Sequence, residues 1–128
     1  MKKMATISIA ILMMLSFFSG CTATKGSYAF VNSKENSGNG FWAITYDSFN
    51  GYKQRTIKRS DDGSNILTIE IVTESGTLDV SITDDSGASV YSGVELNTST
   101  FEVPVNSGEK YTIKLEAVDH IGSFSVKW

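Results

Sequence analysis

The sequence of 128 residues contains one cysteine, one proline and one histidine, and these shortages exclude several kinds of protein. A single cysteine cannot close a disulfide within the chain, so an apolar core has to stabilise the fold. One histidine and one cysteine fall short of the usual ligand sets of zinc. The Gly-x-Ser-x-Gly motif that positions a nucleophilic serine is also missing. We therefore expect no enzyme, no catalytic residues, no metal and no cofactor.

Long apolar segments are also scarce, and the only one lies near the start. Residues 7–18 (ISIAILMMLSFF) are almost entirely apolar. A helix of about 12 residues is too short for a bilayer core of roughly 30 Å, which needs about 20 residues. Lys2 and Lys3 precede the segment, and the small residues Ser19 and Gly20 follow it. This order of basic, apolar and small residues is typical of a secretory signal.

The end of that signal, Ser19-Gly20-Cys21, resembles the lipobox of bacterial lipoproteins, although Phe18 stands where the family usually has an aliphatic residue. The resemblance implies cleavage before Cys21 and a diacylglycerol thioether with further acylation, such as palmitate, on that residue. Two acyl chains anchor a protein firmly, whereas one chain is marginal. We expect residues 1–20 to be a lipoprotein signal peptide. The protein is then anchored through Cys21 to the cell membrane or outer membrane, on the extracytoplasmic side.

Basic residues are too few for a nucleic-acid-binding surface. Removing the first 20 residues leaves 108 of the 128 and takes Lys2 and Lys3 away, which changes the net charge from −3 to −5. An acidic chain offers no broad basic footprint for a phosphate backbone. The expected partners are the membrane, through the lipid on Cys21, and a glycan or another envelope protein.

Residues 21–40 are polar and rich in glycine apart from YAFV at 28–31. The composition of SKENSGNG at 33–40 is typical of a flexible linker. We therefore interpret 21–40 as the lipidated N-terminus and a flexible tether, with residues 28–31 as a possible short edge strand.

After Gly40 the apolar residues recur with a period of two, and no helical pattern of useful length occurs. Turn residues separate the alternating segments at intervals of roughly 10–13 residues, which is typical of a sandwich or barrel. We predict an all-β domain over 41–128, a single antiparallel β-sandwich of about 7–8 strands that is immunoglobulin-like or jelly-roll-like. The alternating segments are 67–72, 78–83, 101–105, 111–117 and 123–128, and the turn signals are Asn50-Gly51, 61–63, Ser75-Gly76, 84–87, 106–108 and Gly122.

Two segments of this region resemble the immunoglobulin-like accessory domains of bacterial surface proteins. GTLDVSITDDSGASVYSG at 76–93 looks like one of their hairpins, and residues 108–128 look like their closing strands. The resemblance covers about the C-terminal half. It implies a sandwich fold and carries no activity.

Acidic pairs and the histidine have plain structural interpretations. Asp61-Asp62 and Asp84-Asp85 could suggest calcium, but a calcium loop alternates its acids over about a dozen residues. Asp and Gly are the ordinary residues of tight turns, so we interpret both pairs as turns. His120, in VDHIG, is expected to be a solvated turn residue.

The segment FWAITYDSFNGYKQRTIKRS at 41–60 is the candidate ligand surface. Asn50-Gly51 is the strongest short signal for a hairpin, and with these two residues as the turn, Tyr46 faces Arg55 and Trp42 faces Arg59. In one account the rings join the core and the arginine stems lie along it. In the other, the rings of Trp42 and Tyr46 are exposed and held as platforms by cation–π contacts. The possible ligand-binding residues are therefore Trp42, Tyr46, Arg55 and Arg59.

Together these observations predict a lipid-anchored extracytoplasmic β-sandwich protein that serves as a non-catalytic binding or adaptor module at the cell envelope. The alternative is a structural or assembly subunit of an envelope complex.

Overall fold

The computed structural model describes residues 24–58, 65–106 and 108–128, and within them every regular element is a β-strand. Cys21 and Arg59 lie outside the described residues, as does the acidic pair Asp61-Asp62. Among the described residues, no helix is long and apolar enough to cross a membrane. The strands are β1 (Thr24–Val31), β2 (Lys34–Gly38), β3 (Phe41–Lys58), β4 (Ile66–Asp84), β5 (Ser89–Gly93), β6 (Ser99–Pro104) and β7 (Lys110–Lys127).

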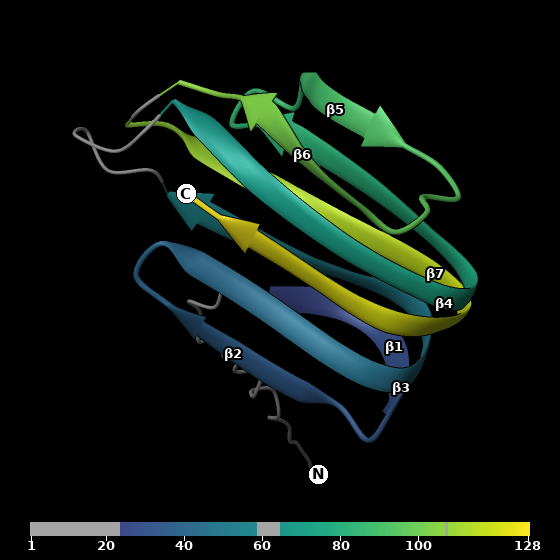
Figure 1. Ribbon diagram of the computed structural model, residues 1–128. Coiled ribbons are helices and arrows are strands. Elements are labelled where there is room, and N and C mark those ends of the chain that lie inside the picture. Colours follow the sequence, from purple (N-terminus) through teal and green to yellow (C-terminus); the bar gives the residue numbers. More distant parts are fainter. Residues whose placement is uncertain (1–23, 59–64, 107) are drawn as a thin grey trace, which may run out of the picture.

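The seven strands form one antiparallel sheet that folds over itself into a sandwich (Figure 1). β3, β4 and β7 are long strands that curve round at one end of the molecule, so each contributes to both layers. One layer has the order β2, first half of β3, second half of β7, first half of β4 and β6. The other has β1, second half of β3, first half of β7, second half of β4 and β5. The all-β sandwich expected from the alternation is therefore confirmed.

The curved part of the three long strands, called the bend below, lies where the sequence predicted hairpin turns. Asn50-Gly51 is inside β3, Ser75-Gly76 is inside β4 and Gly122 is inside β7. The pairing register shifts at the bend, between Tyr46 and Gly51 on β3 and between Thr73 and Thr77 on β4. The prediction that Asn50-Gly51 closes a hairpin is wrong, because Tyr46 pairs with Gly122 and Arg55 pairs with Ile113, both on β7.

The glycines at the bend are required by the close approach of neighbouring backbones. Gly76 has φ of 77°, and a side chain there would collide with the backbone carbonyl of Asp119. Gly51 has φ of 103°, and a side chain there would meet the carbonyl of Ser27. Asn50 adds a bond between the curved strands, because its Oδ1 accepts from the backbone N–H of Asp119 at 2.8 Å. Glycine adopts positive φ readily and has no Cβ that would collide with the neighbouring backbone, so Gly51 and Gly76 allow the strands to bend.

The β4–β5 connection is a true turn, as the sequence predicted for 84–87. The carboxylate of Asp84 accepts hydrogen bonds from the Ser86 hydroxyl at 2.7 Å and from the backbone N–H of Ser86 and Ala88, both at 2.9 Å. These bonds, the one from the hydroxyl first, lower the pKa of Asp84. The side chain thus closes its own turn, which is the usual role of aspartate in this position.

β1 and β2 belong to the sheet, so the expected tether is wrong over 24–27 and 34–38, whereas the short edge strand considered for 28–31 is present as part of β1. β1 pairs with the second half of β3 and β2 pairs with its first half, on the same edge of the long strand. The polar composition that suggested a linker reflects an edge position, where charged and polar side chains are common. Only Thr22 and Ala23 separate Cys21 from the first strand.

The core lies between the layers and contains the inward residues of the alternating segments. Trp42, Phe49 and Phe124 are its largest fully buried side chains. Phe101 and Trp128, which belong to the alternating segments 101–105 and 123–128, pack against the core and are only partly buried. The other buried apolar residues are Ile44, Tyr46, Ile57, Leu67, Ile69, Ile71, Leu78, Val80, Ile82, Val103, Val105, Tyr111, Ile113, Leu115, Ala117 and Val126.

Candidate binding site

Trp42 and Tyr46, two of the four predicted ligand residues, are buried. Trp42 is 0% exposed, and its Nε1–H donates to Glu35 Oε2 at 2.6 Å. Both residues share the inward phase of Ile44 on β3, which places them between the layers. The exposed-platform account of these rings is therefore wrong, and the account in which they join the core is confirmed.

Tyr46 belongs to a buried hydrogen-bonded chain at the bend. Its hydroxyl lies 2.6 Å from Nδ1 of His120, and Nε2 of His120 lies 2.8 Å from the hydroxyl of Thr73. That hydroxyl donates its single hydrogen to the carbonyl of Leu96 at 2.9 Å, so it must accept from Nε2–H. The neutral histidine then carries its hydrogen on Nε2 and accepts the Tyr46 hydroxyl hydrogen at Nδ1. All three side chains are satisfied in this arrangement.

His120 is 0% exposed and lies inside β7, so the prediction of a solvated turn residue is wrong. Asp and Gly around it suggested a turn, but they mark the bend of a continuous strand. Burial lowers the pKa of His120 and raises the pKa of Tyr46, since both charged forms are disfavoured away from water. The histidine therefore has a structural role, as a neutral link between β3, β4 and β7.

Arg55 does not face Tyr46, as the predicted hairpin required, and it contacts the Trp42 ring instead. Its guanidinium carbon is 5.7 Å from the centre of the Trp42 ring, and the side chain is half-buried. This cation–π contact reaches across the interior, because Trp42 and Arg55 belong to opposite halves of the bent strand. The contact packs the core and presents no ring to a ligand. Arg59, the fourth predicted residue, is outside the described residues.

Lys53, which the sequence gave no reason to single out, is 3% exposed between the layers. Its Nζ donates to Glu35 Oε1 at 3.0 Å and to the Tyr28 hydroxyl at 3.2 Å. The same nitrogen lies 4.3 Å from the centre of the Tyr28 ring. Glu35 thus bridges Lys53 and Trp42, and it joins edge strand β2 to the far layer. We call Tyr28, Glu35 and Lys53 the edge cluster.

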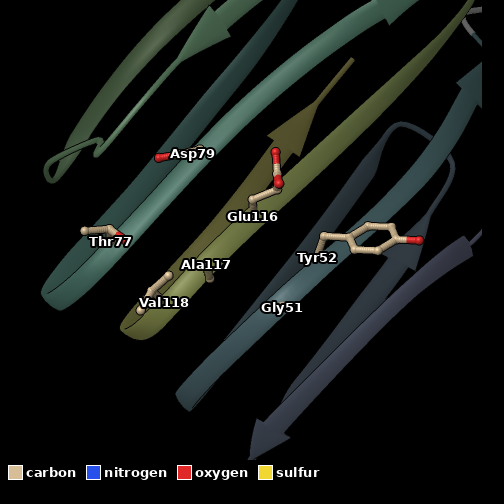
Figure 2. A pocket seen from close by; sticks show the side chains of 7 residues that line it. All are labelled: Gly51, Tyr52, Thr77, Asp79, Glu116, Ala117 and Val118. Atoms are coloured by element: carbon tan, nitrogen blue, oxygen red, sulfur yellow. The ribbon is translucent and has the colours of Figure 1, made fainter.

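The outer face of the second layer carries a shallow hollow beside the bend (Figure 2). Its volume is about 330 Å³. Tyr52 on β3, Glu116 on β7 and Asp79 on β4 line it as direct neighbours in one row across three strands. Gly51, Thr77, Ala117 and Val118 complete the lining. We call this feature the Tyr52 hollow.

The Tyr52 hollow combines one partly exposed aromatic ring with two carboxylates. The Tyr52 ring is 37% exposed, with Lys114 Nζ 5.0 Å from its centre. Lys114 lies 3.9 Å from Glu116 Oε1, a loose surface ion pair that leaves the carboxylate open to other donors. Asp79 Oδ1 accepts the backbone N–H of Glu95 at 2.8 Å, which holds that carboxylate in place. The hollow thus offers an aromatic plane and carboxylate acceptors.

Sequence reasoning missed these residues for a topological reason. The outward positions of Asp79 and Glu116 follow from the alternation with Leu78, Leu115 and Ala117, but their pairing does not. The row forms only because β7 lies between β3 and β4, an order that no local pattern encodes. In the part of the chain that the structure describes, no group of three His, Cys, Asp or Glu residues could hold a metal ion.

No family model matches the chain, and no curated protein matches its sequence. Solved structures that resemble it include the C-terminal CBM6 of LamC, a marine laminarinase from Zobellia galactanivorans. The TM-score is 0.40 at 13% identity, over 81% of this chain and 100% of that one. A family 35 carbohydrate-binding module from Clostridium thermocellum gives 0.39 at 16% identity, over 82% and 98%. Drosophila melanogaster CENP-C bound to CAL1 gives 0.35 at 13% identity, over 74% and 80%. Similarity at this level identifies no ligand of this chain.

Proposed function

We propose that the protein is a lipid-anchored, non-catalytic binding module of the cell envelope, and that the Tyr52 hollow binds a glycan. The observation that carries the proposal is the row of an exposed tyrosine ring and two carboxylates across three rigid strands. A sugar has an apolar C–H face and a rim of hydroxyl donors. The ring suits that face, and ionised carboxylates accept short, strong hydrogen bonds from hydroxyl groups.

The charge and size of the hollow narrow the ligand class. Carboxylates repel anionic sugars, so the expected ligand is a neutral sugar or an amino sugar. A volume of about 330 Å³ is at the small end of ligand sites, which run from roughly 300 to 1,000 Å³. One or two sugar residues of a longer chain would therefore contact the protein. Strands hold all the lining residues named here, so the site is largely preformed.

The first test is glycan binding by the wild type and by Tyr52→Ala. Loss of the ring should weaken binding about tenfold or more, equivalent to about 1.4 kcal/mol, while the thermal melt stays in place. Glu116→Gln should also weaken binding, since a neutral amide is a weaker acceptor. The measurement is a glycan array followed by titration calorimetry on the sugars that bind.

Phe41→Ala is the matched control for that test. Phe41 is on the same strand with nearly the same exposure, 38%, but it lies at the start of β3, away from the bend that Tyr52 follows. Its replacement should leave glycan affinity unchanged. Binding that survives Tyr52→Ala at wild-type strength, or a wild type that binds no neutral or amino sugar, contradicts the assignment.

The anchor is tested separately from the ligand. Lipidation of Cys21 is supported by the basic, apolar and small-residue order that ends in the chain's single cysteine. Metabolic labelling with a fatty-acid analogue should mark the wild type, and Cys21→Ser should lose both the label and the membrane fraction. A label that persists in Cys21→Ser would contradict lipidation of Cys21. It would not affect the proposal that the Tyr52 hollow binds a glycan.

A further inference from the structure

The end of the sandwich opposite the bend has a distinct chemistry. There β3 begins at Phe41 and ends at Lys58, while β7 begins at Lys110 and ends at Lys127. We call these four residues together with Trp128 the terminal end. β1 also starts close to it, because Thr24 pairs with Arg55, three residues before the end of β3.

Two lysines face each other at the terminal end, and no acid among the described residues pairs with either of them. Lys58 pairs directly with Lys110, and both side chains are exposed. Like charges directly opposite on neighbouring strands destabilise a sheet. Among the described residues, no carboxylate lies within 4.0 Å of either nitrogen, and the exposed Glu109 next in sequence makes no such pair. The pair of cations therefore fits an external anionic partner.

Aromatic side chains accompany these cations. Lys127 pairs with Phe41, whose ring is exposed on the outer face. Trp128 is half-buried, and its backbone N–H donates to the Gly40 carbonyl at 2.9 Å. Lys58 and Trp128 line one hollow of about 400 Å³ with Asn39 and Gly40. Tryptophan beside lysine is the combination enriched at membrane–water interfaces.

The short segment between Cys21 and β1 limits how far a lipid on Cys21 can lie from the terminal end. Only Thr22 and Ala23 separate Cys21 from Thr24. A fully extended chain advances at most about 3.6 Å per residue, so Cys21 lies within about 11 Å of Thr24. A lipid on Cys21 therefore places the membrane surface next to the start of β1, and so next to the terminal end.

We propose that the terminal end rests on an anionic bilayer, with Lys58, Lys110 and Lys127 toward the headgroups and Phe41 and Trp128 at the interface. The inference rests on the lipidation of Cys21 proposed above. Juxtamembrane lysines are attracted to anionic lipid within about a Debye length. The bend then faces away from the membrane and presents the Tyr52 hollow outward. Acids near the bend, including Glu74 and Asp119, favour the same orientation because anionic lipid repels them.

The test introduces a reporter tryptophan at each end of the full lipidated chain. Phe41→Trp and Ile121→Trp are a matched pair, since Phe41 is 38% exposed at the terminal end and Ile121 is 36% exposed at the bend. Each variant is inserted in vesicles of equal parts phosphatidylcholine and phosphatidylglycerol whose acyl chains carry bromine, a contact quencher. The emission of the parent chain is subtracted.

The emission added at position 41 should be mostly lost in brominated vesicles, and that added at position 121 should be kept. Lys58→Gln with Lys110→Gln should reduce the quenching at 41 without changing flotation with the vesicles. Equal quenching at both positions, or none at either in a protein that floats, overturns the orientation alone. A wild type that does not float, or a Cys21→Ser variant that floats equally well, overturns the lipid anchor and the orientation together. Glycan binding by the Tyr52 hollow is unaffected by either result.

Discussion

His120 at the bend and Lys53 at the edge are two buried ionisable side chains that the fold accommodates in different ways. His120 is surrounded by the hydroxyl groups of Tyr46 and Thr73, and its burial lowers its pKa. Lys53 is bonded to the carboxylate of Glu35 and to the Tyr28 hydroxyl. A neutral imidazole needs only hydrogen-bond partners, whereas a buried ammonium needs an opposite charge.

The two groups also draw their partners from different parts of the sheet. The partners of His120 come from β3 and β4, which flank β7 in the centre. The partners of Lys53 come from β1 and β2, the edge strands that looked like a tether. We therefore expect β1 and β2 to be part of the folding unit. Glu35 on edge strand β2 neutralises the charge of Lys53, which is buried on the long strand β3.

The largest effect is expected from removing the edge strands. A chain that starts at Ser37 loses β1, most of β2 and the carboxylate of Glu35, and it also loses the Phe30 ring, which packs 4.6 Å from that of Phe49. An unpaired buried charge costs several kcal/mol against a total stability of about 5–15 kcal/mol. This chain should show no cooperative thermal transition by circular dichroism.

A chain that starts at Thr22 is the control, and it should melt like the full sequence. Lys53→Met in the chain that starts at Ser37 should restore part of the transition, because it removes the charge that lost its partner. A cooperative melt of the short chain within a few degrees of the control would show that residues 24–38 are dispensable.

A smaller effect is expected when only the ion pair is broken. Glu35→Gln leaves Lys53 buried without its carboxylate, and the expected loss is about 2–3 kcal/mol. This is below the usual cost for a broken buried pair because the Glu35 side chain is one-third exposed, so water partly solvates the site. Denaturant unfolding of the single variants and of Glu35→Gln with Lys53→Met measures the coupling. The double variant should be more stable than Glu35→Gln alone, and independent effects would refute the pair.

The sequence patterns predicted where the chain departs from regular strand geometry. They did not predict whether it forms a hairpin turn or a bend within one strand at those positions. Asn50-Gly51 and Ser75-Gly76 have the composition of hairpin turns, and both sit at strand bends instead. A hairpin and a bend both need backbone that only glycine adopts easily. What separates them is whether the next segment pairs with the previous one or continues beside the same neighbours, and that depends on the whole sheet. Asp84 to Gly87 was predicted correctly because its bonds are local.

The core could be predicted from alternation, and the candidate site could not. Leu67, Val80 and Ile113 are buried as the period of two requires. Lys53 also has the inward phase of Ile57, yet its charge argues against burial unless Glu35 is known to be near. Tyr52, Asp79 and Glu116 come from three strands far apart in sequence. Their meeting depends on strand order, for which one sequence holds no local signal.

The smallest expected effect is a pH dependence of the stability that arises from His120 and not from Lys53. His120 has a lowered pKa in the folded protein, so the unfolded chain takes up the proton more readily. Stability should therefore be full above about pH 6.5, the unfolded value, and fall as the pH drops below it, by at most about 1.4 kcal/mol per pH unit. The fall should stop once the pH passes the lowered folded value. The lowered pKa of Asp84 acts in a separate, more acidic window, because its contribution is lost only below the usual aspartate value.

His120→Asn removes the titrating group and keeps an oxygen that can accept the Tyr46 hydroxyl hydrogen. It should flatten the stability profile just below about pH 6.5, whatever its overall stability. Glu35→Gln, although more destabilising, should keep the slope of the wild type there, because it leaves His120 and its partners in place. Urea unfolding at half-unit pH steps measures both profiles. Two results would contradict this prediction: a wild-type profile that is already flat over this range, or a slope that persists in His120→Asn. Either would mean that His120 does not cause a pH dependence of the stability.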